Sequence, residues 1–215
     1  MTQQPQAPMC SKAQAETLKW IGLACMLSDH LCQFLGLRYP GWELVGTAAM
    51  PAFALALGAQ LTQHHAGAAA KRLLYWGLLV LPVYYWACWP TQTHPDILIG
   101  LACAAGWIAA EDDPPKRRWA IRGALFLAAF ASDFGQTAIM LASAAREKRR
   151  HYRYTYLALG TLGLYMWNGG IGAGWGIAWY AASRYLPGTE RTKRFFLRAY
   201  AIQWPLLAVA RIAGA

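Results

Sequence analysis

The chain has 215 residues, of which 57% are hydrophobic and only 14% are charged. A soluble domain carries about 25% charged residues, so this composition argues against a soluble enzyme. The formal net charge of +10 would suit a nucleic-acid partner, but the basic residues lie at the ends of apolar runs, where membrane proteins place them. We therefore predict a lipid bilayer, and no nucleic acid, as a partner of the chain.

The apolar residues form runs that are separated by short basic or Gly/Pro segments, a pattern typical of a polytopic helical membrane protein. We predict an all-α fold, a transmembrane bundle of about nine spans (eight to ten), with residues 1–17 as a polar tail and residues 18–215 as one membrane domain. The predicted spans cover residues 18–37, 42–61, 73–89, 97–110, 119–131, 134–145, 153–167, 171–186 and 195–213.

Basic and non-basic junctions alternate along these spans, and by the positive-inside rule this predicts a cytoplasmic N-terminus. The alternative is that spans 119–131 and 134–145 merge into one helix broken at Ser132–Gly135, which the positions of the basic junctions argue against. The basic junctions contain Lys71 and Arg72, then Lys116, Arg117 and Arg118, then residues 146–150, and then Arg184 with residues 191–194.

Asp29 and His30 lie inside the first apolar run, near the middle of the predicted span. An ionisable residue there costs at least ~2.5 kcal/mol, so the pair predicts chemistry within the membrane. His30 suits a general base because histidine titrates near neutral pH, with Asp29 or a polar group of another helix holding it. Gln33 lies one turn further on and can reach either residue. The alternative is a polar pair that only bonds a neighbouring helix for packing.

Three further polar residues lie near the predicted outer ends of the spans, and we expect them on the substrate side: His94, Asp96 and Asp133. On the opposite face, basic clusters can bind the phosphates of a cytosolic cofactor, because arginine makes bidentate contacts with phosphate. The residues predicted for this role are Lys71, Arg72, Arg117 and Arg118. His64 and His65 are adjacent but lack further spaced ligands, so we predict no metal site.

Five glycines at the start of the predicted span 171–186 produce overlapping GxxxG spacings: Gly169, Gly170, Gly172, Gly174 and Gly176. Such spacing favours close helix packing, and it would also permit a homodimer. The alternative is a smooth wall along which a thin ligand arm can lie.

Several segments resemble the TraX family, inner-membrane proteins of conjugative transfer systems. The most specific are Met26-Leu-Ser-Asp29-His30 in the first span and Pro51-Ala-Phe53 in the second, and Val45-Gly46 and Asp133-Phe-Gly135 follow in the same order as in the family. The likeness runs over most of residues 18–150, and the small size and basic C-terminal half look most like the TrbP-type branch.

This resemblance implies a multi-pass protein of the bacterial inner membrane that acetylates the N-terminus of a conjugative pilin subunit, with acetyl-CoA as the donor. It also implies kinship with acyltransferases that use a membrane-embedded histidine. One departure is Thr47, because the family usually has arginine after the glycine that Gly46 matches. Two other classes remain open: a non-catalytic factor for pilin maturation or assembly, and a proton-coupled transporter that uses Asp29 and His30 as a relay.

Overall fold

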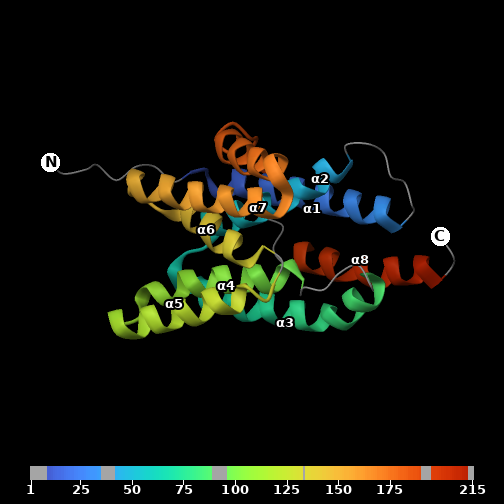
Figure 1. Cartoon of the computed structure of the whole chain (residues 1–215), viewed down its shortest axis with the longest axis horizontal. Coiled ribbons are helices and arrows are strands. Elements are labelled where there is room, and N and C mark those ends of the chain that lie inside the picture. Colours follow the sequence, from blue (N-terminus) through green and yellow to red (C-terminus); the bar gives the residue numbers. More distant parts are fainter. Residues whose placement is uncertain (1–8, 35–41, 89–95, 133, 190–194, 213–215) are drawn as a thin grey trace.

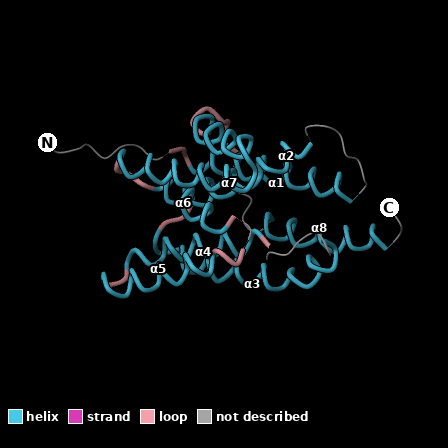
Figure 2. The backbone as a smooth tube through the Cα atoms, viewed as in Figure 1, coloured by secondary structure: helices cyan, strands magenta, loops and turns pink. Residues whose placement is uncertain are grey.

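The computed structural model describes residues 9–34, 42–88, 96–132, 134–189 and 195–212. Within these ranges all regular elements are helices (Figure 2), so the predicted all-α fold class is confirmed for the described part of the chain. The elements are α1 (Lys12–Phe34), α2 (Trp42–Gln60), α3 (Gln63–Cys88), α4 (Ile97–Ala109), the short 3-10 helix η1 (Ala110–Asp112), α5 (Pro115–Ala129), α6 (Gly135–Arg146), α7 (Arg150–Ala182) and α8 (Phe195–Ile212).

The helices form two groups that meet at α6 (Figure 1). In the first group, α2 packs against α1, α6 and α7. In the second group, α4 packs against α3, α5 and α6, while α8 lies on α3 and also contacts α1. Helices α2, α4 and α6 therefore carry most of the core, and much of the inward surface of these three helices consists of alanine and leucine.

Among the described residues, one helical segment, Gln63–Trp86, is both long and apolar enough to cross a membrane by itself. Leu44–Gln60 is apolar but shorter. The bundle of about nine spans and the cytoplasmic N-terminus therefore stay predictions.

Helix α1 begins at Lys12, earlier than the predicted span, because a capping box precedes it. The Ser11 hydroxyl accepts a hydrogen bond from the Gln14 backbone N–H (3.1 Å), and the Gln14 side chain accepts one from the Ser11 N–H (2.8 Å). Residues 12–17 are thus helical, so α1 begins inside the segment predicted as a polar tail (1–17), and that division of the chain stays a prediction. Cys10, just before the helix, is buried, and burial raises the pKa of its thiol to about 11, so this thiol stays protonated at neutral pH.

The helical path is interrupted between α5 and α6, as the separate spans 119–131 and 134–145 predict. Phe134 has a φ of 56°, a left-handed conformation that ends the preceding helical path. Gly135 permits the tight turn, since a Cβ there would overlap the Ala129 carbonyl and the Ser132 hydroxyl. The two helices run in opposite senses, because the start of α5 and the end of α6 line the same pocket.

A second break divides α7 at Gly169, between the predicted spans 153–167 and 171–186. Its φ of 65° and ψ of −161° lie in a region that essentially only glycine adopts. Among the described residues, only part of the predicted close packing of the glycine run is made within the chain. A Cβ at Gly170 or Gly174 would meet nothing within 4 Å, whereas one at Gly176 would meet the Leu164 side chain at 2.8 Å.

The basic ends of the helices gather at one end of the molecule. The Gln14 amide near the start of α1 donates to the Arg184 carbonyl after α7 (2.7 Å), and Gln60 at the end of α2 donates to Glu16 of α1 (2.8 Å). Arg146 at the end of α6 donates to the Leu61 carbonyl just after α2 (2.6 Å). Among the described residues, the basic junctions that contain Arg118, Arg146 and Arg184 thus lie at one end of the molecule.

The close contact between α2 and α6 gives a direct test of this packing. A Cβ on Gly58 would overlap the backbone of Ala142, so Gly58→Ala should force the two helices apart and cost about 1–3 kcal/mol. Gly123→Ala is the matched control, because its Cβ would meet nothing within 4 Å and alanine favours a helix by about 1 kcal/mol. We expect a lower thermal midpoint in detergent for Gly58→Ala than for Gly123→Ala; the reverse order would contradict the packing.

Candidate functional site

His30 lies near the end of α1 and faces α8. Its Nδ1 atom is 3.4 Å from the Gln203 Oε1 atom, and its ring lies 4.6 Å from the Trp204 ring, centroid to centroid. Gln203 and Trp204 are 5% and 1% exposed, so the imidazole packs onto a buried part of the fold. His30 is the fifth residue from the C-terminal bound of α1, and its position near the middle of a membrane span stays a prediction.

Asp96 reaches the same helix α8 from the start of α4. The Tyr200 hydroxyl donates a hydrogen bond to Asp96 Oδ1, and the same carboxylate caps α4 by accepting from the Leu98 N–H (3.3 Å). Asp96 and Tyr200 are both buried. The Trp204 ring links His30 to the Asp96–Tyr200 pair, since it contacts the His30 ring and lies 6.3 Å from the Tyr200 ring.

We call this group the His30–Asp96 cluster; it comprises His30, Tyr84, Asp96, Tyr200, Gln203 and Trp204. Tyr84 of α3 completes it with an edge contact to Trp204 at 4.9 Å. Sequence reasoning placed His30 and Asp96 among the candidates but missed the residues of α8. The available signal was Gln203, a polar side chain within an otherwise apolar stretch of that helix.

Asp29 faces a different helix from His30, because neighbouring residues on a helix point about 100° apart. Its carboxyl group lies directly over Gly46 of α2, where a Cβ would overlap it. Gly46 therefore leaves the space that Asp29 occupies. The next residue, Thr47, donates from its hydroxyl to the Leu44 carbonyl (2.9 Å), which also accepts from the Trp175 indole N–H (2.7 Å).

The other predicted site residues are dispersed. His94, Asp133 and the side chain of Gln33 lie outside the described residues. Lys71 and Arg72 are exposed on α3 and do not line the pocket described below, and Arg117 is exposed and forms an ion pair with Asp113 (3.2 Å). Of the four predicted phosphate contacts, Arg118 lines that pocket.

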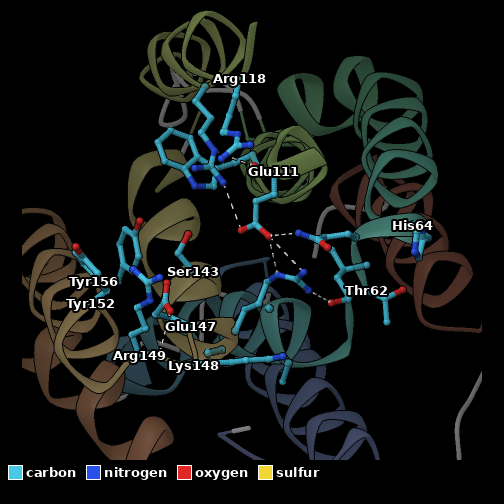
Figure 3. A pocket seen from close by; sticks show the side chains of 18 of the residues that line it. Thr62, His64, Glu111, Arg118, Ser143, Glu147, Lys148, Arg149, Tyr152 and Tyr156 are labelled. Atoms are coloured by element: carbon cyan, nitrogen blue, oxygen red, sulfur yellow. Dashed lines mark hydrogen bonds and ion pairs between the residues drawn. The ribbon is translucent and has the colours of Figure 1, made fainter. Parts of the chain in front are cut away.

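A pocket of about 930 Å³ opens where the basic helix ends meet, and we call it the basic pocket (Figure 3). Its walls come from the ends of α2, α4 and α6 and from the starts of α3, α5 and α7. Its charged lining residues are Glu111, Arg118, Arg122, Arg146, Glu147, Lys148 and Arg149, and its aromatic ones are Trp107, Trp119, Tyr152 and Tyr156.

Glu111 lies at the centre of this pocket and joins three helices. Its Oε2 atom accepts from Gln63 of α3 (2.7 Å) and pairs with Arg146 of α6 (3.3 Å). Its Oε1 atom pairs with Arg122 of α5 (3.3 Å), whose guanidinium also lies 4.8 Å from the centre of the Trp107 ring. Glu111 thus fixes the positions of two arginines in the pocket wall.

The two sites lie at opposite ends of α4. Asp96 precedes the helix and Glu111 follows it in η1, a separation of about 22 Å at 1.5 Å per residue. Any reaction that used both sites would need a reactant long enough to connect them.

Comparison with known proteins identifies the family of the chain. The sequence profile of the family described as "TraX protein" matches residues 14–167, well over half of the chain. The chain belongs to the TraX family. The match includes Asp29, His30, Gly46 and the residues of the basic pocket, whereas α8 lies beyond it.

A relative of this TraX-family chain is the Escherichia coli protein named "Protein TraX". The two are 29% identical over 157 residues, which cover 69% of this chain and 62% of the relative. The alignment therefore spans less than two thirds of that protein. No solved structure matches the chain. The family that the sequence resembled is confirmed, and the comparisons do not distinguish the TrbP-type branch within it.

The contact between Asp29 and Gly46 can be tested by a double-mutant cycle. Gly46→Ala should lower the thermal midpoint, because its methyl group would displace the Asp29 carboxyl at a cost of about 1–3 kcal/mol. Asp29→Ala removes that obstacle, so the double variant should be less destabilised than the sum of the two single changes. Gly67→Ala is the control, since its Cβ would meet Ala109 at an ordinary 3.9 Å. Strictly additive effects would contradict the contact.

Proposed function

We propose that this TraX-family chain is a multi-pass acyltransferase of the bacterial inner membrane that transfers an acetyl group from acetyl-CoA to the N-terminus of a conjugative pilin subunit. Membership of the family supports a role in conjugative transfer. The observation that carries the enzymatic proposal is the His30–Asp96 cluster, in which a histidine is held by a buried amide in an apolar part of the fold. We also assign the chain to the TrbP-type branch, on its basic C-terminal half.

The outer surface supports a membrane location. Large apolar side chains are exposed on α3, α5, α7 and α8, and large exposed apolar patches mark surfaces that contact a membrane or another protein. With these faces toward lipid, the basic end of the molecule would lie in the cytoplasm, as the positive-inside rule requires. Examples of the exposed side chains are Leu78, Leu79, Leu127, Phe130, Leu162, Met166, Leu206 and Val209.

The contact with Gln203 favours the neutral tautomer of His30 that a general base needs. With the Gln203 Oε1 atom as the acceptor, His30 carries its proton on Nδ1 and keeps a lone pair on Nε2. A neighbour that fixes the tautomer and the orientation of a histidine in this way is a recurring part of general-base sites. Gln203 therefore acts as a positioning residue, the part that the sequence assigned to Asp29 or to a group on another helix.

In the proposed reaction, the pilin amine attacks the carbonyl carbon of the thioester and His30 Nε2 takes the proton that the amine loses. The carbon–sulfur bond then breaks, and His30 returns that proton to the sulfur, which leaves as free coenzyme A. The products are one N-acetylated pilin and one thiol. Asp96 and Tyr200, and the outer residues His94 and Asp133, are proposed to lie on the side from which the pilin arrives.

The intact mass of the cognate pilin tests the proposal. In cells with the unmutated protein the pilin should gain roughly 42 Da, the mass of one acetyl group, and in cells with His30→Gln or without the protein it should not. Glutamine keeps a polar side chain but supplies no base near neutral pH, so the loss should affect chemistry more than folding.

Membrane accumulation and thermal midpoint of the His30→Gln protein are the controls. An unmodified pilin together with normal accumulation supports the base. The same pilin mass in all three strains would contradict acylation and favour a role in pilin assembly, for which His30 would serve only in packing.

A further inference from the structure

We propose that the basic pocket binds the phosphorylated nucleotide part of coenzyme A, with Arg118, Lys148 and Arg149 as its phosphate contacts. This assignment rests on the proposed acetyl transfer. It replaces the separate basic clusters on α3 and at Arg117 with one site, made where six helix ends meet.

The lining of the basic pocket carries more positive than negative side chains. Five cationic side chains line the pocket against two carboxylates, and Glu111 engages two of the five, Arg122 and Arg146. Among the described residues, no ion pair joins a carboxylate to Arg118, Lys148 or Arg149. Three cations in one concave site, with nothing of opposite charge paired to them, favour a polyanion, and guanidinium groups suit phosphate in particular.

The positions of Arg118, Lys148 and Arg149 also favour a bound phosphate. Arg118 donates through Nε and Nη2 to the Asp113 carbonyl (3.2 and 3.0 Å), which holds its guanidinium in place while leaving Nη1 for a ligand. Arg149 lies 5.8 Å from the centre of the Tyr152 ring and precedes α7. Figure 3 shows Arg118 on the side of the pocket opposite Lys148 and Arg149, so a ligand between them would meet cations from two sides.

Two exposed aromatic side chains border the basic pocket and favour a nucleotide. Trp119 is 67% exposed and Tyr152 is 47% exposed, and both border the pocket. Exposed aromatic faces beside cations suit a nucleotide, because a base can stack while its phosphates pair. The volume of about 930 Å³ is within the usual range for ligand pockets.

The distance between the basic pocket and the His30–Asp96 cluster also suits coenzyme A. The basic pocket and the His30–Asp96 cluster are separated by about 22 Å along α4. A reactant that connects the two sites must carry its reactive group far from its anionic part, as coenzyme A carries its thiol on a long flexible arm remote from its phosphates.

Binding of coenzyme A to the purified full-length protein, in neutral detergent without anionic lipid and at physiological salt, tests this assignment by calorimetry. The double variant Lys148→Gln, Arg149→Gln should weaken binding by at least about tenfold, and Arg118→Gln should weaken it in the same direction. The matched control is Lys71→Gln, Arg72→Gln, which removes the same charge from exposed positions outside the pocket and should change affinity by less than about twofold.

The proposal is overturned if the unmutated protein does not bind coenzyme A, or if the control double variant loses as much affinity as the pocket variant. A thermal midpoint measured without ligand shows whether each variant is folded. If Lys148→Gln, Arg149→Gln does not fold, Arg118→Gln gives the same comparison, since Arg118 lies on α5 and not in the segment between α6 and α7.

A second arm tests the stacking. Trp119→Ala should weaken binding of adenosine 3′,5′-bisphosphate but leave binding of inorganic pyrophosphate unchanged, because only the first ligand carries a base. Equal losses for both ligands would contradict a nucleotide site.

A third arm separates a nucleotide from a lipid headgroup, which offers the same phosphate chemistry. If cardiolipin binding depends on Lys148 and Arg149 whereas coenzyme A binding does not, the pocket is a lipid site and the proposal fails. None of these measurements uses pilin. Coenzyme A binding with no change in pilin mass would therefore sink the proposed function alone, and modified pilin without pocket-dependent binding would sink this inference alone.

Discussion

The interaction on which the rest of the structure depends is the engagement of one carboxylate, Glu111, by three helices. Gln63, Arg122 and Arg146 converge on it from α3, α5 and α6, and Arg146 also reaches the Leu61 carbonyl after α2. A half-buried carboxylate with such partners holds the helix ends together more firmly than an exposed ion pair would. Among the described residues, no carboxylate forms an ion pair with the remaining cations of the pocket, so this end of the bundle keeps a positive charge that attracts anions.

The opposite end of α4 is organised by aromatic and amide groups rather than by ion pairs. Trp204 of α8 contacts both the His30 ring and the Tyr200 ring, and Tyr200 donates to Asp96. Helix α8 thus brings α1 and α4 into one buried cluster although it contacts α1 only lightly. The family match ends before α8, so His30 is a feature of the matched region, whereas its partner Gln203 comes from the part of the chain beyond it.

Local signals predicted much of the fold, and they failed where the decisive contacts are distant in sequence. The apolar runs and basic junctions located the helices and their breaks, because glycine at 169 and the turn before Gly135 are marked by residue type. The start of α1 was missed although the Ser11–Gln14 capping box is readable. At the candidate site, the cost of burying polar groups singled out Asp29 and His30, whereas Asp96 was a candidate because it lies near the predicted outer end of a span. Gln203 and the convergence of cations around Glu111 arise from packing between helices that lie far apart along the chain, which spacing within one helix cannot reveal.

The central claim is that the chain itself transfers an acetyl group with His30 as the base. The most direct measurement uses the purified protein in liposomes with pilin and acetyl-CoA, and follows both the free thiol released and the pilin N-terminus. The account predicts one thiol per acetylated pilin, with the rate lost in His30→Gln and retained in Gly123→Ala. Thiol release without pilin acetylation, no release at all, or full activity in His30→Gln would contradict it.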